Sequence, residues 1–177
     1  MNPNKTHTRQ ILKKNQQRTA PALFSQSKMV LHNIRSMHNV GAAFRNADAF
    51  GIGEVVLSGY TPAPPRPEIS KTAIGAEEHV PWQKCPDFNQ FYDEHRGTFH
   101  FVGVEQTNVS SPLASYQITA KPQCLVFGNE VTGIDDELLP IMDDFVEIRQ
   151  FGFKHSLNVS VSIGICLYAF LHKFESL

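Results

Sequence analysis

The stretch FGFKHSLNVSVSIGICLYAF (residues 151–170) combines two periodicities. From Ser156 to Ser162 polar and apolar residues alternate, which is the period of a β-strand, whereas the chain from Gly164 onward is almost wholly apolar. The apolar pattern continues to Lys173, a length typical of a helix and too long for an ordinary strand. We therefore predict a helix here and treat the alternation as accidental.

Small polar residues crowd the start of this predicted helix. With Ser156 as its N-cap, the helix begins near residue 157, and Ser156 and Asn158 occupy a first turn whose free backbone N–H groups can face a site. Its apolar residues share one face, and its small residues would allow close helix packing. A capped core helix without a ligand explains the same letters, so this segment alone leaves both interpretations open. The apolar face holds Leu157, Val161, Ile165 and Tyr168, and the small residues are Ser160, Ser162 and Gly164.

The composition limits the class of protein. A chain of 177 residues that is 41% hydrophobic can bury one ordinary core, and its net charge of -1 excludes a uniformly basic, histone-like protein. The three cysteines, Cys85, Cys124 and Cys166, are widely spaced and lack a metal-ligand pattern, which predicts reduced residues in a cytoplasmic protein and no metal site. No apolar run is long enough to span a membrane, and the N-terminus lacks the apolar core of a signal peptide.

Strand and helix patterns alternate along the chain and predict an α/β fold with a mainly parallel sheet covered by helices on both faces. Ligands of such sheets bind beyond the carboxyl ends of the strands, so the loops after Asn33, Val104, Phe127 and Ile148 are the candidate site. The predicted strands are 28–33, 54–60, 98–104, 123–127 and 145–148, and the predicted helices are 38–51, 69–78, 88–96 and 135–143, the last capped by Asp135.

The N-terminal leader has a charge of its own. Residues 1–27 contain five basic residues and no acid, and we treat them as separate from a single domain over 28–177. If the leader becomes helical, three of its basic side chains come near one face, which predicts RNA binding. An untethered tail is the alternative. The basic residues are Lys5, Arg9, Lys13, Lys14 and Arg18.

Two further segments contain candidate polar residues. In FGNEVTG (127–133), Gly128 would let the backbone approach a ligand and Glu130 would stand at the edge of the sheet, although a Gly-Asn turn with a solvated glutamate explains the same letters. In HNVGAAFRNADAFG (38–51), Asn39 is a natural N-cap and Arg45 could simply pair with Asp48. The glycine fingerprints of dinucleotide and phosphate loops are absent, which disfavours hydride transfer and NTP hydrolysis.

Three segments in this order resemble the signature motifs of the SpoU (TrmH-like) branch of the SPOUT RNA methyltransferases. They are HNVGAAFRNADAFGI (38–52), LVFGNEVTGIDDELL (125–139) and IRQFGFKHSLNVSVSIGICLYAF (148–170), and ISKTAIGAEEHVPW (69–82) is similar to the family as well. The resemblance implies a SPOUT-type α/β domain with a deep C-terminal trefoil knot. It also implies a homodimer that binds S-adenosylmethionine and methylates the ribose 2′-hydroxyl of RNA, either tRNA or rRNA.

The same resemblance assigns the site residues. Arg45 would help to remove the proton from the 2′-hydroxyl, and Asn39, Glu130, Ser156 and Asn158 would orient the reacting groups. The cofactor would be bound by Val104, Gly128, Ile148, Ser156 and Leu157, largely through backbone groups. The dimer interface would include Ser160, Ser162, Gly164 and Phe170. Many relatives have glycine where this chain has Val131, which puts the exact shape of that loop in question.

A non-catalytic RNA-binding or assembly protein on the same scaffold is the alternative. Such a protein would keep the apolar residues of the fold but would not need Arg45, Glu130 and Asn158 together, and this chain has all three. An oxidoreductase on a doubly wound sheet is disfavoured by the missing glycine fingerprint.

Overall fold

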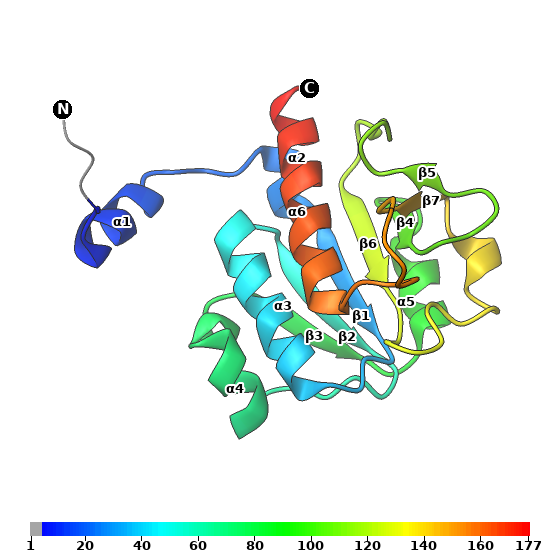
Figure 1. The fold of residues 1–177 in the computed structure, drawn as a ribbon, viewed down its shortest axis with the longest axis horizontal. Helices are drawn as coiled ribbons and strands as arrows, with labels where there is room; N and C mark the ends of the chain where they lie inside the picture. The colour runs from blue at the N-terminus through cyan, green and yellow to red at the C-terminus, as the bar shows by residue number, and fades with distance from the viewer. Residues whose placement is uncertain (1–4) are drawn as a thin grey trace.

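The computed structural model describes residues 5–177 and contains a seven-stranded sheet in the order β3-β2-β1-β6-β4-β7-β5 (Figure 1). Every neighbouring pair of strands is parallel, which confirms the predicted α/β class. The strands are β1 (Lys28–His32), β2 (Glu54–Ser58), β3 (Trp82–Cys85), β4 (His100–Val104), β5 (Ser111–Pro112), β6 (Gln123–Phe127) and β7 (Asp144–Glu147). The two short edge strands, β3 and β5, were not predicted.

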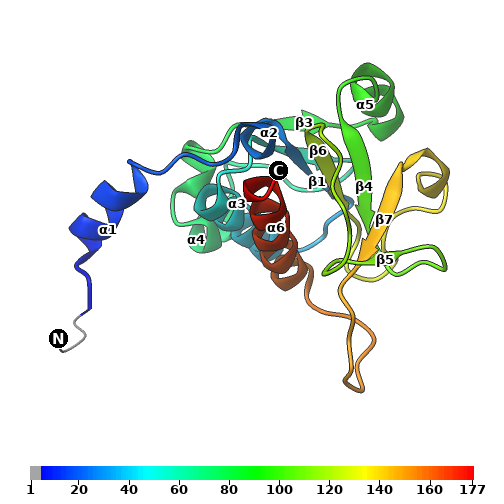
Figure 2. The same ribbon diagram turned by 90° about the horizontal axis from the view of Figure 1, so that it is seen from above.

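Helices cover both faces of the sheet, as predicted. Figure 2 shows α3 and α6 on one face and α5 on the other. The helices are α1 (Thr8–Asn15), α2 (Ala22–Gln26), α3 (Met37–Phe50), α4 (Pro67–Ala73), α5 (Phe88–His95) and α6 (Val159–Glu175), with short 3₁₀ turns at η1 (Ala76–Glu78) and η2 (Leu139–Ile141).

The core has two apolar layers because successive side chains of a strand point to opposite faces of the sheet. In β1, Met29 and Leu31 pack on the face of α3 and α6, whereas Val30 packs on the face of α5. All three side chains are fully buried. The continuous apolar runs of the central strands therefore follow from burial on both faces.

Two predicted helix caps are wrong, and one predicted helix does not form. Ser36 caps α3 by accepting a hydrogen bond from the Asn39 N–H, so Asn39 lies inside the first turn. Asn158, not Ser156, caps α6. The helix predicted at 135–143 is absent and only η2 forms, because Pro140 lacks an N–H and Asp135 uses its carboxylate to bind His32 and Asn33.

α6 has the predicted apolar face, but that face points away from the core. Its core side is formed by other residues, and Phe170, predicted at a dimer interface, is fully buried in its own subunit. Gly164 faces α3, and the Asn46 side chain lies 3.4 Å from the position a Cβ would take, which is ordinary van der Waals contact, so close packing does not require a glycine here. The exposed face consists of Val161, Ile165 and Tyr168, whereas Leu157, predicted on the same face, precedes the N-cap of the helix and lines the pocket described below.

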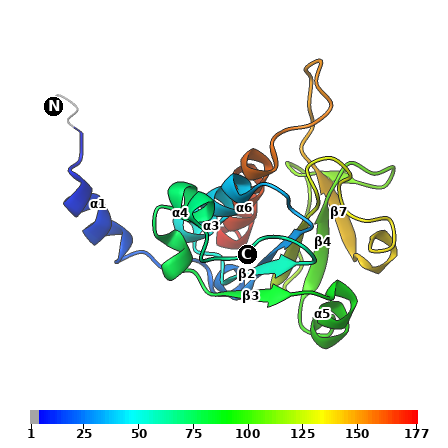
Figure 3. The same ribbon diagram turned by 90° about the horizontal axis from the view of Figure 1, so that it is seen from below.

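The leader divides into two parts. Figure 3 shows α1 projecting away from the body of the protein, and none of its residues is buried. By contrast, α2 packs against α6, and Phe24 is completely buried. The packed part of the protein therefore begins with α2. The basic residues of the leader all precede α2 in sequence, and their side chains are exposed: Lys5, Arg9, Lys13, Lys14 and Arg18.

Strand order alone does not define how the chain is threaded, so the trefoil knot stays a prediction. Within residues 5–177, no helix has both the length and the apolar character needed to cross a membrane.

Candidate functional site

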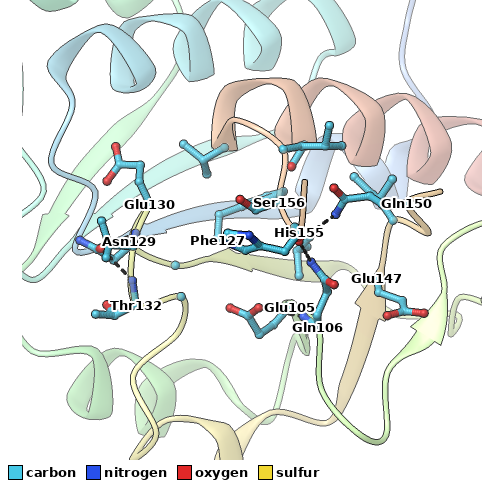
Figure 4. Close-up of a pocket in the computed structure, with 18 of the residues that line it drawn as sticks. Glu105, Gln106, Phe127, Asn129, Glu130, Thr132, Glu147, Gln150, His155 and Ser156 are labelled. Atoms are coloured by element: carbon cyan, nitrogen blue, oxygen red, sulfur yellow. Dashed lines mark hydrogen bonds between the residues drawn. The ribbon is translucent and has the colours of Figure 1, made fainter. Parts of the chain in front are cut away.

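A pocket of about 370 Å³ lies at the carboxyl ends of three adjacent strands, β6, β4 and β7 (Figure 4). The register brings these ends together, because Val104 of β4 is paired with Phe127 on one side and with Val146 on the other. The N-terminal approach to α6 forms another wall. The loops after Val104, Phe127 and Ile148 line the pocket, as predicted from the parallel sheet, whereas the loop after Asn33 does not.

The pocket combines an apolar wall with negative charge. Its carboxylates come from Glu105, Glu130 and Glu147, and among the described residues no lysine or arginine lines it. Such a site favours a ligand that carries both an apolar surface and positive charge. The structure places all five residues predicted to bind the cofactor in this lining: Val104, Gly128, Ile148, Ser156 and Leu157.

Asn129 fixes the conformation of the loop that follows β6. Its side-chain oxygen accepts from the backbone N–H groups of Val131 (2.8 Å) and Thr132 (3.2 Å), while Asn129 and Gly133 exchange backbone hydrogen bonds. Val131 is 76% exposed and is not among the residues with positive φ, so a β-branched residue fits this loop without strain. A Cβ at Gly128 would overlap the backbone of Gly133, which explains the glycine.

Glu105 braces the loop after β4 against the loop after β6. Its carboxylate accepts from the backbone N–H of Ile134 (3.1 Å) and from that of Gln106 (2.8 Å). Gly133 has a φ of 73°, and a side chain there would run into the Glu105 carboxylate. Glu105 therefore holds two walls of the pocket together.

Glu130 links the three sequence motifs. It accepts hydrogen bonds from the backbone N–H groups of Arg35 (2.9 Å) and Ser36 (3.0 Å) and from the Asn39 amide (2.9 Å). Asn158 in turn donates its amide to the Asn39 oxygen (3.2 Å). These bonds form a continuous chain from the pocket to the starts of α3 and α6, so three of the predicted catalytic residues are brought together.

The surroundings of Glu130 keep it ionised. Partial burial raises the pKa of this carboxyl, but the hydrogen bonds from the Arg35 N–H, the Asn39 amide and the Ser36 N–H outweigh that effect and hold the pKa below its ordinary value. The carboxylate also lies at the N-terminus of α3, where negative charge is favourable. The interpretation as a merely solvated glutamate is therefore wrong.

A second polar cluster supports the site from beneath. His32 contacts Ser58 through Nδ1 (2.9 Å) and Asp135 through Nε2 (3.0 Å), and Asn33 donates its amide to the same carboxylate (2.9 Å). The amide of Asn129 also donates to the Asn33 backbone oxygen (2.7 Å). The ends of β1 and β2 are thereby tied to the loop after β6.

The two remaining predicted catalytic residues have different positions. Ser156 lines the pocket. Arg45 is exposed on α3, outside the lining, and among residues 5–177 it forms no ion pair with Asp48. The expected surface ion pair is therefore absent.

Sequence reasoning pointed to the right loops but missed most of the polar residues on them. Gln106 and Gln150 both direct their amides at the backbone oxygen of His155, at distances of 2.8 and 3.4 Å (Figure 4). Their position directly after predicted strands was the available signal, but glutamine and histidine are also common on solvated loops. The missed residues are Glu105, Gln106, Asn129, Glu147, Gln150 and His155.

Comparison with known proteins gives consistent matches over nearly the whole domain. A model of the SpoU rRNA Methylase family matches residues 26–168. The 23S rRNA (guanosine-2′-O-)-methyltransferase RlmB of Vibrio parahaemolyticus is 32% identical over 150 residues, which cover 79% of this chain and 56% of the relative. The chain thus spans little more than half the length of that protein.

Solved structures share the fold. The TrmH/SpoU tRNA modifying enzyme of A. aeolicus superposes with a TM-score of 0.75 at 26% identity, covering 94% of this chain and 85% of that one. The SpoU methyltransferase AviRb of Streptomyces viridochromogenes, solved in complex with AdoMet, superposes with a TM-score of 0.78 at 22% identity, covering 86% and 59% of the two chains. The family model, which matches residues 26–168, shows that the chain belongs to the SpoU rRNA methylase family.

Proposed function

We propose that this protein is an S-adenosylmethionine-dependent RNA 2′-O-ribose methyltransferase acting on tRNA or rRNA. The observation that carries the proposal is the acidic, partly apolar pocket joined by hydrogen bonds to Asn39 and Asn158. RlmB of Vibrio parahaemolyticus and the A. aeolicus enzyme are named for rRNA and tRNA respectively, and both substrate classes remain within the proposal.

The pocket fits the cofactor. Its volume of about 370 Å³ falls in the range of small-molecule sites, and its apolar residues offer a slot for a flat adenine. Glu105, Glu130 and Glu147 provide negative charge toward a ligand whose sulfonium and ammonium groups are positive. When bound, S-adenosylmethionine would supply an already activated methyl group, so alignment with the ribose oxygen would account for much of the rate.

The residues of the chain would position the ribose. Glu130 holds the amide of Asn39, and Asn39 holds that of Asn158, so these side chains present fixed donors and acceptors at the mouth of the site. Arg45 would assist removal of the 2′-hydroxyl proton, guided by a substrate phosphate. Its exposure and its lack of an ion pair with Asp48 among the described residues leave the guanidinium accessible to RNA.

Two copies would form the working unit. Val161, Ile165 and Tyr168 form an exposed apolar stripe on α6, and pairing two copies through it would bury apolar area on both. RNA would also contact the leader, whose five basic residues lie on or beside α1. We place the activity in the cytoplasm, which fits the three free cysteines.

The experiment has two stages. Calorimetry with S-adenosylmethionine and its demethylated product should give binding without RNA, and tritiated cofactor should then label RNA from a strain that lacks the gene. Mapping the 2′-O-methyl sites identifies the substrate. Arg45→Ala should abolish labelling and leave cofactor affinity unchanged, whereas the exposed control Arg96→Ala, at the C-cap of α5, should keep both. Cofactor binding without transfer to any RNA of that strain would favour a non-catalytic RNA-binding protein.

A further inference from the structure

The loop after β7 carries two exposed phenylalanines. Phe151 is 95% and Phe153 100% exposed, and Figures 2 and 3 show this orange segment projecting from the body of the protein. A single apolar side chain on a surface needs no explanation, but two bare rings one residue apart on a projecting loop indicate a contact surface. We call residues 149–155 the aromatic arm.

The base of the aromatic arm is fixed while its tip is free. The Gln106 amide donates to the backbone oxygen of His155 (2.8 Å), which ties the returning limb to the loop after β4. At the tip, nothing lies within 4 Å of the position that a Cβ of Gly152 would occupy. The two rings flanking Gly152 are therefore presented to solvent on a loop whose base is fixed.

The arm borders the proposed cofactor pocket. A second hollow of about 370 Å³ is lined by the whole arm together with Gln106, Glu147 and Ile148. Gln106, Glu147, Ile148, Gln150 and His155 line both hollows, so the two spaces adjoin. A planar group stacked on the arm would therefore lie beside the bound cofactor.

The charge of the arm selects the kind of ligand. Arg149 and Lys154 flank the rings, and the chain contains no acidic residue from 148 to 174. The hollow beside the arm is lined by Arg149 and Lys154 and by one glutamate, Glu147, whereas the neighbouring pocket is lined by three glutamates and by no lysine or arginine among the described residues. A flat ligand that carries negative charge fits aromatic rings between cations, whereas a cationic cofactor fits the acidic pocket.

We propose that the aromatic arm binds an unpaired nucleotide of the RNA substrate, with Phe151 and Phe153 stacking on bases and Arg149 and Lys154 contacting phosphates. Only an unstacked base offers its faces to an aromatic side chain, so the arm restricts the substrate to single-stranded or looped RNA. This inference rests on the proposed function and names its substrate class.

The first test measures affinity by fluorescence anisotropy. The probes are a labelled single-stranded RNA of about twelve nucleotides and a perfectly paired duplex of the same sequence. Phe151→Ala and Phe153→Ala should each weaken single-strand binding by about 5- to 150-fold, tyrosine should preserve it, and leucine should not restore it. Val109→Ala is the control, because Val109 is an exposed apolar residue outside both hollows, and it should bind like wild type. Duplex affinity should change by less than about twofold in every variant.

The second test observes stacking directly. Phe153→Trp places an indole on the arm of a chain whose other tryptophan is Trp82 in β3. Single-stranded RNA should quench this fluorescence, and S-adenosylmethionine alone should not. Quenching by the cofactor alone, or alanine variants that lose cofactor affinity, would make the arm a cofactor clamp and overturn the proposal.

The remaining outcomes are also decisive. If the alanine variants keep full affinity for single-stranded RNA, or if their loss appears only as a change in oligomeric state by light scattering, the arm does not recognise nucleotides. If the wild-type protein binds no cofactor, the proposed function is refuted. If the wild-type protein binds cofactor and the arm variants bind RNA normally, only the proposed binding of nucleotides by the aromatic arm is refuted.

Discussion

Replacing Glu130 should loosen the start of α3 and the mouth of the site together. The carboxylate accepts from two backbone N–H groups, those of Arg35 and Ser36, and from the Asn39 amide, at 2.9 to 3.0 Å. Glu130→Gln keeps one acceptor oxygen but removes the charge and replaces the other oxygen by an amide NH₂, a donor that would face another donor. Glu130→Ala removes every acceptor.

The size of the effect follows from these bonds. A typical hydrogen bond contributes about 0.5–1.5 kcal/mol net to the free energy of unfolding. Because Glu130 is exposed, each of its hydrogen bonds should contribute an amount near the lower end of this range. Glu130→Ala should therefore lower the free energy of unfolding by about 1–2 kcal/mol, which corresponds to a fall in Tm of about 2–8 °C for a chain of this length. Activity should fall much further, because the Asn39 and Asn158 amides lose their orientation.

The effect should depend on pH. The pKa of Glu130 is lowered from 4.5 in the folded protein, so the folded state favours the ionised form. The stabilisation is fully present above the unfolded-state pKa and is lost as the pH falls through the lower folded-state pKa. The difference in stability between wild type and Glu130→Gln should be constant near neutral pH and should shrink below about pH 4.5.

Urea unfolding over a range of pH, followed by circular dichroism, measures this difference. Glu137→Gln is the matched control, because Glu137 is exposed and its side chain forms no hydrogen bond or ion pair in the described part of the chain. The reasoning is refuted if Glu130→Gln and Glu137→Gln have equal stability at neutral pH. A difference that persists unchanged at acid pH would refute the assignment of the effect to the ionised carboxylate.

Three further predictions concern other parts of the chain. Gly128→Ala should weaken cofactor binding measured by calorimetry, since its Cβ would overlap the backbone of Gly133; unchanged affinity would contradict this role. Ile165→Asp, on the exposed face of α6, should give a monomer by light scattering with near wild-type stability, whereas a persistent dimer would place the interface elsewhere. Deleting residues 1–20, which spares α2 and its buried Phe24, should flatten the slope of log RNA affinity against log salt by roughly two to four units, and an unchanged slope would make the leader a tail.

The central part of the fold could be predicted because local and global signals agree there. The β1–α3–β2 unit combines apolar strands with a helix that ends at Gly51, whose φ of 76° suits a left-handed C-cap. The edge strands β3 and β5 were missed because WQKC and SP have no apolar pattern and exist only by pairing with β2 and β7. Their pairing partners are distant in sequence, which local propensity does not register.

The three wrong N-cap assignments have one cause. The residue types of Ser156, Asn39 and Asp135 all favour an N-cap position. In each case either a neighbouring residue caps the helix instead, or the side chain is already hydrogen-bonded to residues distant in sequence. Asp135 is far from His32 and Asn33 in sequence, but its carboxylate contacts both side chains in the folded protein. That carboxylate is therefore not available to cap a helix. Asn158 replaces Ser156 because its side-chain oxygen reaches the Ser160 N–H at 2.8 Å. Only the tertiary structure decides between such candidates.

The net charge of -1 conceals a strong segregation of charge. Every acidic residue except Glu175 lies between residues 28 and 147, so the leader and the segment from 148 to 174 contain only basic and neutral residues. The acidic part supplies the carboxylates of the pocket, and the basic parts supply α1 and the aromatic arm. The proposed function involves a cationic methyl donor and a polyanionic RNA, which favour fields of opposite sign, and the segregation of charge along the chain would provide a separate segment for each.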